Sequence, residues 1–179
     1  MKQSRAFAFA LFSLIIFSQA PSVSAAFAQR DHVTGPEADL IREAQAIDKR
    51  TDVFVRAAER RVLVLTDPQA AETKQVKKET EKWGPLPAGS RFELFSDIAK
   101  ILDEAITNID DFSNRSPSSE LLPKALRKLS DACVRLVAQL EPLRATSRGA
   151  EREPLNKVIE HAETIIEAAK KLTPPSSKK

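Results

Sequence analysis

Apolar residues recur at steps of three and four along four long segments of the chain, and polar residues fill the positions between them. This spacing places the apolar side chains on one face of an α-helix. The four stripes run over residues 40–65, 95–112, 122–143 and 155–172. We therefore expect four long amphipathic helices. The first is expected to be one continuous helix over 36–66, about 45 Å long at 1.5 Å per residue.

The third stripe is the most regular of the four, because it alternates steps of four and three without a break. Its members are Leu122, Leu126, Leu129, Cys133, Leu136, Leu140 and Leu143. A repeat of this kind is typical of helices that pack nearly parallel, at about 20°, as in bundles and coiled coils. The third helix is therefore expected to lie in the centre of a helical bundle.

Local signals mark where two of these helices begin. Thr34 is followed three residues later by Glu37, and Ser90 is followed in the same way by Glu93. Both pairs match the capping box, in which each side chain accepts a hydrogen bond from the other residue's backbone amide. Between the first two stripes, residues 68–83 favour helix but carry little apolar surface, so a short, exposed helix is expected there.

These elements predict an all-α fold: an antiparallel up-down helical bundle of four main helices plus one weaker, exposed helix. Short connections between neighbours force consecutive helices to run antiparallel. The composition agrees with this fold class, because four glycines and no tyrosine in 179 residues argue against a many-stranded sheet.

The first 28 residues are expected to be a secretory signal peptide rather than part of the fold. Lys2 and Arg5 precede an apolar run over 6–17, and small residues follow it. The run is shorter than the roughly twenty residues of a membrane span, although an uncleaved membrane anchor is the alternative. The mature protein is then exported, to a periplasm or to the extracellular medium. The remaining chain is expected to divide into a flexible lead-in over 29–35, the helical bundle over 36–172 and a disordered tail over 173–179.

The charge of the chain limits the classes of partner it can bind, and its cysteine content limits the disulfides it can form. Removal of residues 1–28 leaves 26 basic residues against 25 acidic ones. A near-neutral chain with interspersed charges has no basic patch of the kind that nucleic acids bind, so no nucleic-acid partner is expected. Beyond residue 28 no apolar run is long enough to span a membrane. Since the chain has one cysteine, no disulfide can form within it, even in an oxidising compartment.

The single thiol and the two histidines are the first candidates for chemistry. Cys133 occupies a step of the third stripe, so it is expected to fill the core as a small hydrophobe. An intermolecular disulfide and a nucleophile are the alternatives. His32 falls in the expected lead-in, and His161 flanks the fourth stripe as a boundary residue. Neither histidine has the Glu-x-x-His spacing of di-iron bundles.

Acidic residues cluster on the second predicted helix, at Asp97, Asp103, Glu104, Asp110 and Asp111. They could bind a cation or a basic partner, but a solvated helix face is the expected arrangement. The chain has no phosphate loop, dinucleotide fingerprint, nucleophile elbow or zinc-protease helix. We therefore predict no catalytic, cofactor-binding or metal-binding residues, no cofactor and no enzyme activity.

The first predicted helix carries apolar residues outside its main stripe, at Val53, Ala57 and Val64. Such a helix is either central in its bundle, which is the expected arrangement, or covered by a partner. The sequence favours an exported, soluble protein that acts through protein–protein contacts or self-association of its helix surfaces. One alternative is a carrier that holds a small molecule or cofactor in an apolar pocket between helices. The other is an enzyme whose site is assembled from scattered carboxylates.

Overall fold

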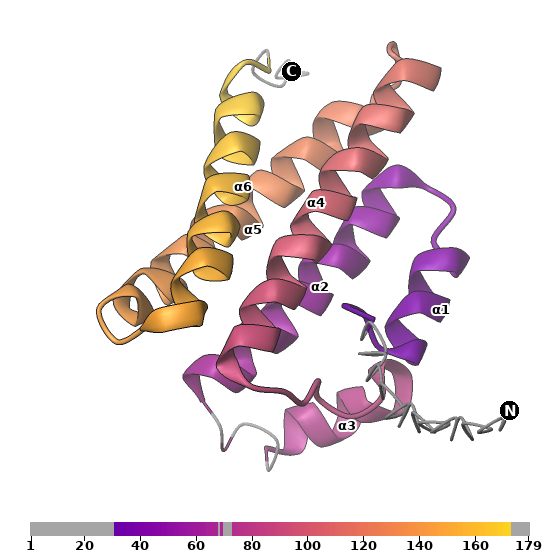
Figure 1. Ribbon diagram of the computed structural model, residues 1–179. Coiled ribbons are helices and arrows are strands. Elements are labelled where there is room, and N and C mark those ends of the chain that lie inside the picture. Colours follow the sequence, from indigo (N-terminus) through magenta and orange to yellow (C-terminus); the bar gives the residue numbers. More distant parts are fainter. Residues whose placement is uncertain (1–30, 68, 70–72, 173–179) are drawn as a thin grey trace, which may run out of the picture.

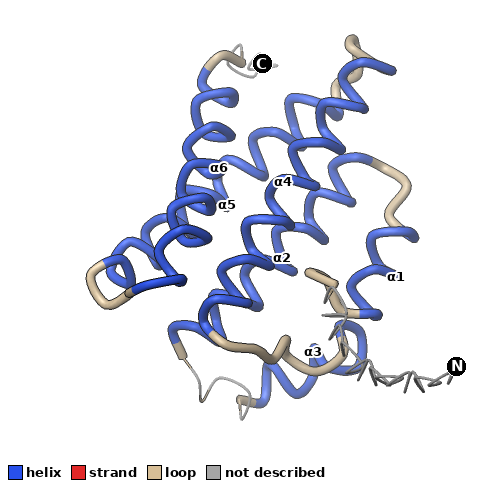
Figure 2. Tube along the Cα trace, viewed as in Figure 1, coloured by secondary structure: helices blue, strands red, loops and turns tan. Residues whose placement is uncertain are grey.

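The described residues form helices joined by short loops and contain no strand (Figure 2). The computed structural model describes residues 31–67, 69 and 73–172. In chain order the elements are α1 (Gly35–Glu43), α2 (Ile47–Thr66), α3 (Lys74–Trp83), α4 (Arg91–Arg115), α5 (Leu121–Arg144), a 3₁₀ turn (Gly149–Glu151) and α6 (Arg152–Lys170). The predicted all-α fold class is therefore confirmed.

Helices α2, α4, α5 and α6 form a four-helix bundle in which consecutive helices run antiparallel (Figure 1). Helix α2 packs against α4 and α5, and α6 packs against the same two helices on the other side. Helices α4 and α5, although consecutive, make few contacts and lie diagonally across the bundle. Each main helix is therefore covered on two sides, and two of the four neighbouring pairs, α2 with α5 and α4 with α6, are parallel.

Ion pairs join α2 and α5 along their length, as expected of two parallel helices. Three ion pairs of 2.7 to 3.0 Å join the two helices, and the partner always lies 76 residues further along the chain: Asp48–Lys124, Asp52–Lys128 and Glu59–Arg135. Asp48 is buried, and its hydrogen bond with Lys124 lowers the pKa of the Asp48 carboxyl more than burial raises it. These pairs fix the axial position of one helix against the other.

The regular stripe on α5 forms the centre of the core, as predicted. Leu129, Cys133, Leu136 and Leu140 are buried, while the outer leucines of the stripe are half-buried. The small residues Ala125 and Ala132 on α5 are also fully buried. Because α5 lies between α2 and α6, it needs apolar or small residues on more than one face.

The prediction of one continuous helix over 36–66 is wrong, because the chain leaves the helix at residues 44–46 and begins again at Ile47. Helix α1 folds back beside α2, which brings the Glu37 carboxylate within 2.9 Å of Arg60. On a straight helix this separation of 23 positions would span about 35 Å. The ionic contacts between α1 and α2 therefore favour the break over helix continuity, although the local sequence favours helix.

The helix ends agree with most of the local signals. Thr34 with Glu37 and Ser90 with Glu93 form the two predicted capping boxes. Helix α3 has no buried residue, which confirms the weak, exposed helix, and Gly84 ends it with a positive φ of 68°. The predicted start of this helix at 68 lies outside the described residues, and α3 begins after the N-cap Thr73.

Two other helix bounds differ by a few residues from the sequence prediction. Helix α4 continues to Arg115, beyond the end of its apolar stripe at 112, and α6 begins at Arg152, before the start of its stripe at 155. The expected signal peptide over 1–28 and the tail over 173–179 lie outside the described residues. Within the part of the chain that the structure describes, no helix has the length and apolarity needed to cross a bilayer.

Candidate functional site

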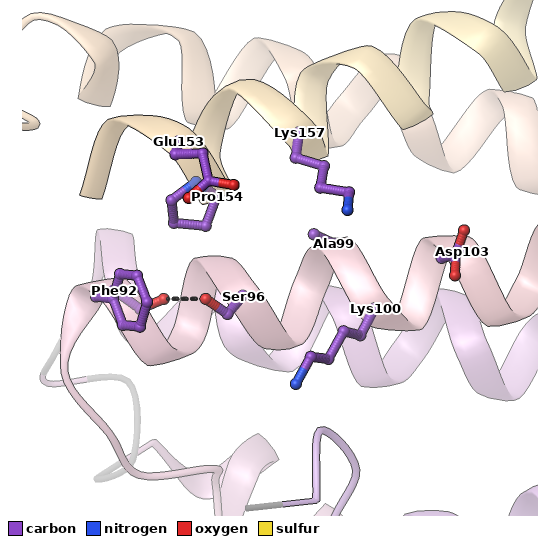
Figure 3. Close-up of a pocket in the computed structure, with 8 residues that line it drawn as sticks. All are labelled: Phe92, Ser96, Ala99, Lys100, Asp103, Glu153, Pro154 and Lys157. Atoms are coloured by element: carbon purple, nitrogen blue, oxygen red, sulfur yellow. Dashed lines mark hydrogen bonds between the residues drawn. The ribbon is translucent and has the colours of Figure 1, made fainter. Parts of the chain in front are cut away.

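A groove of about 190 Å³ opens on the surface between α4 and α6 (Figure 3). We call it the α4–α6 groove. Its lining is Phe92, Ser96, Ala99, Lys100 and Asp103 from α4, with Glu153, Pro154 and Lys157 from α6. The two helices are parallel here, so the groove lies beside the first turns of both.

The shape of the groove follows from the sizes of the side chains along α4. Phe92, Ser96 and Ala99 follow one another at helical spacing, so a large residue is succeeded by two small ones. The Ser96 hydroxyl donates to the Phe92 carbonyl oxygen at 2.8 Å, which keeps it against its own helix (Figure 3). The space beyond Phe92 is thus left to solvent, and Pro154 faces it from α6.

Phe92 is the aromatic residue of this groove, and 43% of its surface is exposed. It lies in the first turn of α4, two residues after the N-cap Ser90. Its neighbours Leu94 and Phe95 point into the core and are buried. Phe92 is therefore left at the mouth of the groove, where it presents an apolar ring to any molecule that enters.

Lys157 brings a positive charge to the same groove. In Figure 3 it extends from α6 toward α4 above Ala99, whereas Lys100 is directed away from α6. Lys157 forms no ion pair with any other residue that the structure describes. Asp103 lies near the far end, with its Oδ1 4.0 Å from Nδ1 of His161. The groove therefore combines an apolar wall with a cation that can pair with an incoming carboxylate.

A second feature is a buried ion network of Glu37, Arg60, Arg61 and Asp97. The Glu37 side chain is 0% exposed and receives hydrogen bonds from Arg60 and Arg61 at 2.9 to 3.1 Å. It also accepts from the Thr34 amide, which is part of the capping box. Two carboxylates and two guanidinium groups give the network a net charge of zero, so each buried charge has a partner of opposite sign.

The two arginines also donate hydrogen bonds to backbone carbonyl oxygens. Arg60 donates to the carbonyl oxygens of Trp83, Gly84 and Pro85 at 2.6 to 2.8 Å and lies over the Trp83 ring. Arg61 donates to the carbonyl oxygens of His32 and Ala57, both at 2.7 Å. The network thereby joins α1, α2, the end of α3 and the segment before α1. The network lies inside the protein, and all of its described, buried donor atoms make hydrogen bonds except Nε of Arg61, which has only the ion pair with Asp97, so its role is structural.

The solvated acidic face predicted for α4 is wrong at Asp97. This residue is 4% exposed, and its Oδ2 lies 3.6 Å from Nε of Arg61. Asp97 shares its helix face with Leu94 and Ile101, both of which are buried. These two apolar neighbours, at spacings of three and four, are the sequence signal that could have placed Asp97 inside.

The other acidic residues of α4 do not converge on one site. Glu104 Oε2 accepts a hydrogen bond from His32 Nε2 at 2.8 Å, or pairs with it when the ring is protonated. Asp103, Asp110 and Asp111 are exposed, as expected of a solvated face. The acidic residues of α4 therefore lie in three separate places. Asp97 belongs to a buried ion pair, Glu104 contacts His32 in a half-buried pair, and the other three are exposed to solvent.

The two histidines lie in different surroundings. His32 was placed in the lead-in by the sequence, and its ring and carbonyl oxygen both contact the bundle. His161 is a half-buried boundary residue of α6, as predicted, and its Nδ1 has no hydrogen-bond acceptor or donor. No group of three histidine, cysteine or carboxylate side chains gathers around a possible metal position within the described residues.

Cys133 lies inside the core, which confirms its predicted role as a small buried hydrophobe. Its side chain is 0% exposed, and burial raises the pKa of the thiol to about 12. The reactive thiolate is therefore scarce at neutral pH. The buried sulfur also cannot reach a second chain while the bundle is folded, which argues against the intermolecular disulfide.

A thiol reagent is expected to leave native Cys133 unmodified at mildly alkaline pH, while the same protein in concentrated urea reacts completely. The reason is that both burial and the raised pKa suppress attack by the thiolate. The measurement is the release of the coloured thiol of a disulfide reagent over time. A Cys133→Ala, Val134→Cys double variant moves the only thiol to an exposed neighbour and supplies the control. Equal rates for the native protein and this control would contradict the placement of Cys133.

The extra apolar residues of the first predicted helix are mostly covered by its neighbours in the bundle. Ala57 is fully buried, Val64 packs against the core and Val53 is half-buried. Central burial, the expected arrangement, is therefore confirmed for Ala57, whereas Val53 and Val64 are partly buried. A partner surface has to be sought elsewhere on the molecule.

Sequence reasoning missed the residues that make the α4–α6 groove. Phe92 lies between Ser90 and Glu93 of the capping box, and Lys157 lies outside the fourth apolar stripe, so the sequence alone singles out neither residue. The spacing of Phe92, Ser96 and Ala99 on one face, outside the apolar stripe, was the available signal. That Pro154 and Lys157 lie opposite them depends on the parallel packing of α4 and α6.

The chain matches no family model, no curated protein and no solved structure.

Proposed function

We propose that this protein is an exported, non-enzymatic binding protein that docks a partner protein in the α4–α6 groove. The observation that carries the proposal is Phe92, an aromatic side chain left 43% exposed beside an open hollow. Aromatic residues, phenylalanine included, are enriched in the cores of protein interfaces, and a few anchors that fill pockets carry most of the binding energy.

The groove also indicates the chemistry of the partner segment. Phe92 and Pro154 form an apolar pair that can receive an apolar side chain. Lys157, without an ion pair among the described residues, can bind a carboxylate one helical turn further along. The partner is therefore a protein segment that presents an apolar residue followed by an acidic one, and the two contacts together set its orientation.

The other large exposed apolar residue in the described chain, Val134 on α5, lacks such surroundings. It is 54% exposed, which exceeds the exposure of Phe92. It does not line the α4–α6 groove. Single exposed apolar residues are common on protein surfaces and need no function. Val134 therefore serves as the matched control for Phe92.

The test is site-specific photo-cross-linking in cells that make the protein, with a benzophenone amino acid at position 92 or at position 134. The expected result is one discrete partner cross-linked from position 92 and absent from position 134. Once purified, that partner should bind the wild-type protein directly. Phe92→Ala should then weaken binding by about 2 kcal/mol, roughly a 30-fold rise in Kd, and Lys157→Glu should weaken it further. Val134→Ala should leave Kd unchanged.

Two results would overturn the proposal. One is the same set of products from both positions, since this would reflect collisions rather than docking. The other is a cross-link from position 92 to a second copy of this chain, which would replace the partner by self-association. Circular dichroism of each variant confirms that the helices remain, because Phe92, Lys157 and Val134 lie outside the core.

The carrier and the enzyme have weaker support. The space between the four main helices is filled by buried side chains such as Phe54, Ile98, Leu129 and Leu136, whereas the carrier hypothesis needs an apolar pocket there. The enzyme hypothesis needs a cleft in which the acidic residues of α4 converge, and they are spread over separate surroundings. Both alternatives stay predictions.

A further inference from the structure

We infer that the hollow at the break between α1 and α2 is a binding site for a small oxyanion, a phosphate or carboxylate group on a compact molecule. We call this place the break hollow. It has a volume of about 320 Å³ and lies where α2 begins and α4 ends. It is thus at the opposite end of α4 from the α4–α6 groove (Figure 1).

The charged side chains that line the break hollow are all positive. Arg50 and Arg115 line it together with the polar residues Gln45, Asn108 and Ser116. No carboxylate lines it within the described part of the chain. Neither arginine forms an ion pair with a described residue, in contrast to Arg91, Arg135 and Arg144, which each pair with a glutamate. Two guanidinium groups without counterions in one hollow attract an anion.

Arg50 is held in place in a way that suits anion binding. Its Nε donates to the Ala44 carbonyl oxygen at 3.0 Å, and its Nη1 donates to Asn108 Oδ1 at 3.2 Å. Asn108 is itself fixed, because its Nδ2 donates to the Glu104 carbonyl oxygen at 2.9 Å. The Nη2 group of Arg50 has no acceptor among the described residues. A guanidinium fixed in this way loses little freedom when it binds an oxyanion.

Arg115 and the start of α2 add to the same site. The Nε of Arg115 donates to the Asp111 carbonyl oxygen at 3.1 Å, and both terminal nitrogens stay available. The N-cap of α2 is Ala46, whose side chain cannot accept a hydrogen bond from the first amides. The positive end of the helix dipole is therefore left without a capping side chain beside the hollow.

The walls of the break hollow limit the rest of the ligand. Ile47 and Phe112 supply apolar surface next to the charged groups. A volume near 320 Å³ is at the small end of ligand pockets. The ligand is therefore a compact molecule with one oxyanion and a small apolar body, which phenyl phosphate and benzoate represent as probes.

The test is a titration of the isotope-labelled intact chain with phenyl phosphate and, separately, with benzoate, followed by the amide resonances. Saturable shifts at Ile47, Arg50 and Ser116 are expected with at least one probe. The tighter probe identifies the oxyanion as phosphate or carboxylate. A lower affinity for inorganic phosphate would show that Phe112 and Ile47 contact the body of the ligand.

Variants decide whether the two arginines form the site. Arg50→Gln and Arg115→Gln should each weaken binding about tenfold or more, because each removes charge-assisted hydrogen bonds. Arg144→Gln removes an arginine from another surface and should leave the affinity unchanged. Arg115 is exposed at the end of α4, so its variant tests the site even if Arg50→Gln loosens the break. The inference is overturned if neither probe saturates, or if Arg144→Gln weakens binding as much as Arg115→Gln.

Discussion

Replacement of Glu37 by alanine is expected to lower the free energy of unfolding by about 3–5 kcal/mol, the range found when one partner of a buried ion pair is removed. The Glu37 carboxylate is 0% exposed and is the acceptor for both Arg60 and Arg61. Without it, two guanidinium groups stay buried with only Asp97 to balance them. The loss therefore comes mainly from uncompensated buried charge and much less from the contacts themselves.

Urea unfolding followed by circular dichroism measures this loss. Glu37→Gln separates the two contributions, since it keeps the size and part of the hydrogen bonding but removes the charge. Asp39→Ala on the same helix is the matched control: Asp39 pairs with Arg42 on the exposed surface. Surface changes of that kind stay within about 0.5 kcal/mol. A loss for Glu37→Ala no larger than that for Asp39→Ala would show that the buried ion network does not stabilise the fold.

Leu136→Ala is expected to cost about 2–5 kcal/mol, the range for large-to-small changes in a packed core. Leu136 is 1% exposed, and α5 holds it between α2 and α6. The removed methyl groups leave a cavity that the neighbouring helices can fill only by moving. Because α5 is covered on two sides, such a movement disturbs both interfaces at once, so we expect little relaxation.

Thermal and urea unfolding measure this effect, with Val134→Ala as the control two residues away on the exposed side of the same helix. The control should change the free energy of unfolding by less than about 0.5 kcal/mol. The difference between the two variants reports burial, since both lie in the middle of α5 and both lose methyl groups. Equal losses would contradict the assignment of the leucine stripe to the core.

The helices and their faces were largely predictable because they depend on residues close in sequence. The stripe on α5 has steps of three and four, and its middle residues are those that the structure buries. The capping boxes at Thr34 and Ser90 also form as predicted, since each needs only a partner three residues away. Gly84 ends α3 because it can adopt a positive φ that other residues rarely adopt.

The candidate sites were not predictable from the same information. The α4–α6 groove exists because α4 and α6 lie side by side although α5 separates them in sequence. The break hollow exists because the chain leaves the helix at residues 44–46, where alanine and glutamine favour helix. In both places the residues that meet belong to different helices, and the apolar spacing within one helix does not report which helices become neighbours.

The sequence by itself determined that the chain forms amphipathic helices, where most of them begin and end, and which leucines and isoleucines fill the core. Only the tertiary structure decided that α1 folds back onto α2, that Asp97 is buried, and that α4 and α5 lie diagonally. The physical reason is the separation along the sequence of the residues that interact. Helix periodicity and capping act over three or four residues, whereas Glu37 reaches Arg60 across 23 residues and Arg61 reaches Asp97 from another helix. The free energy of burying such charges depends on every partner being present together, so it is settled only when the helices pack.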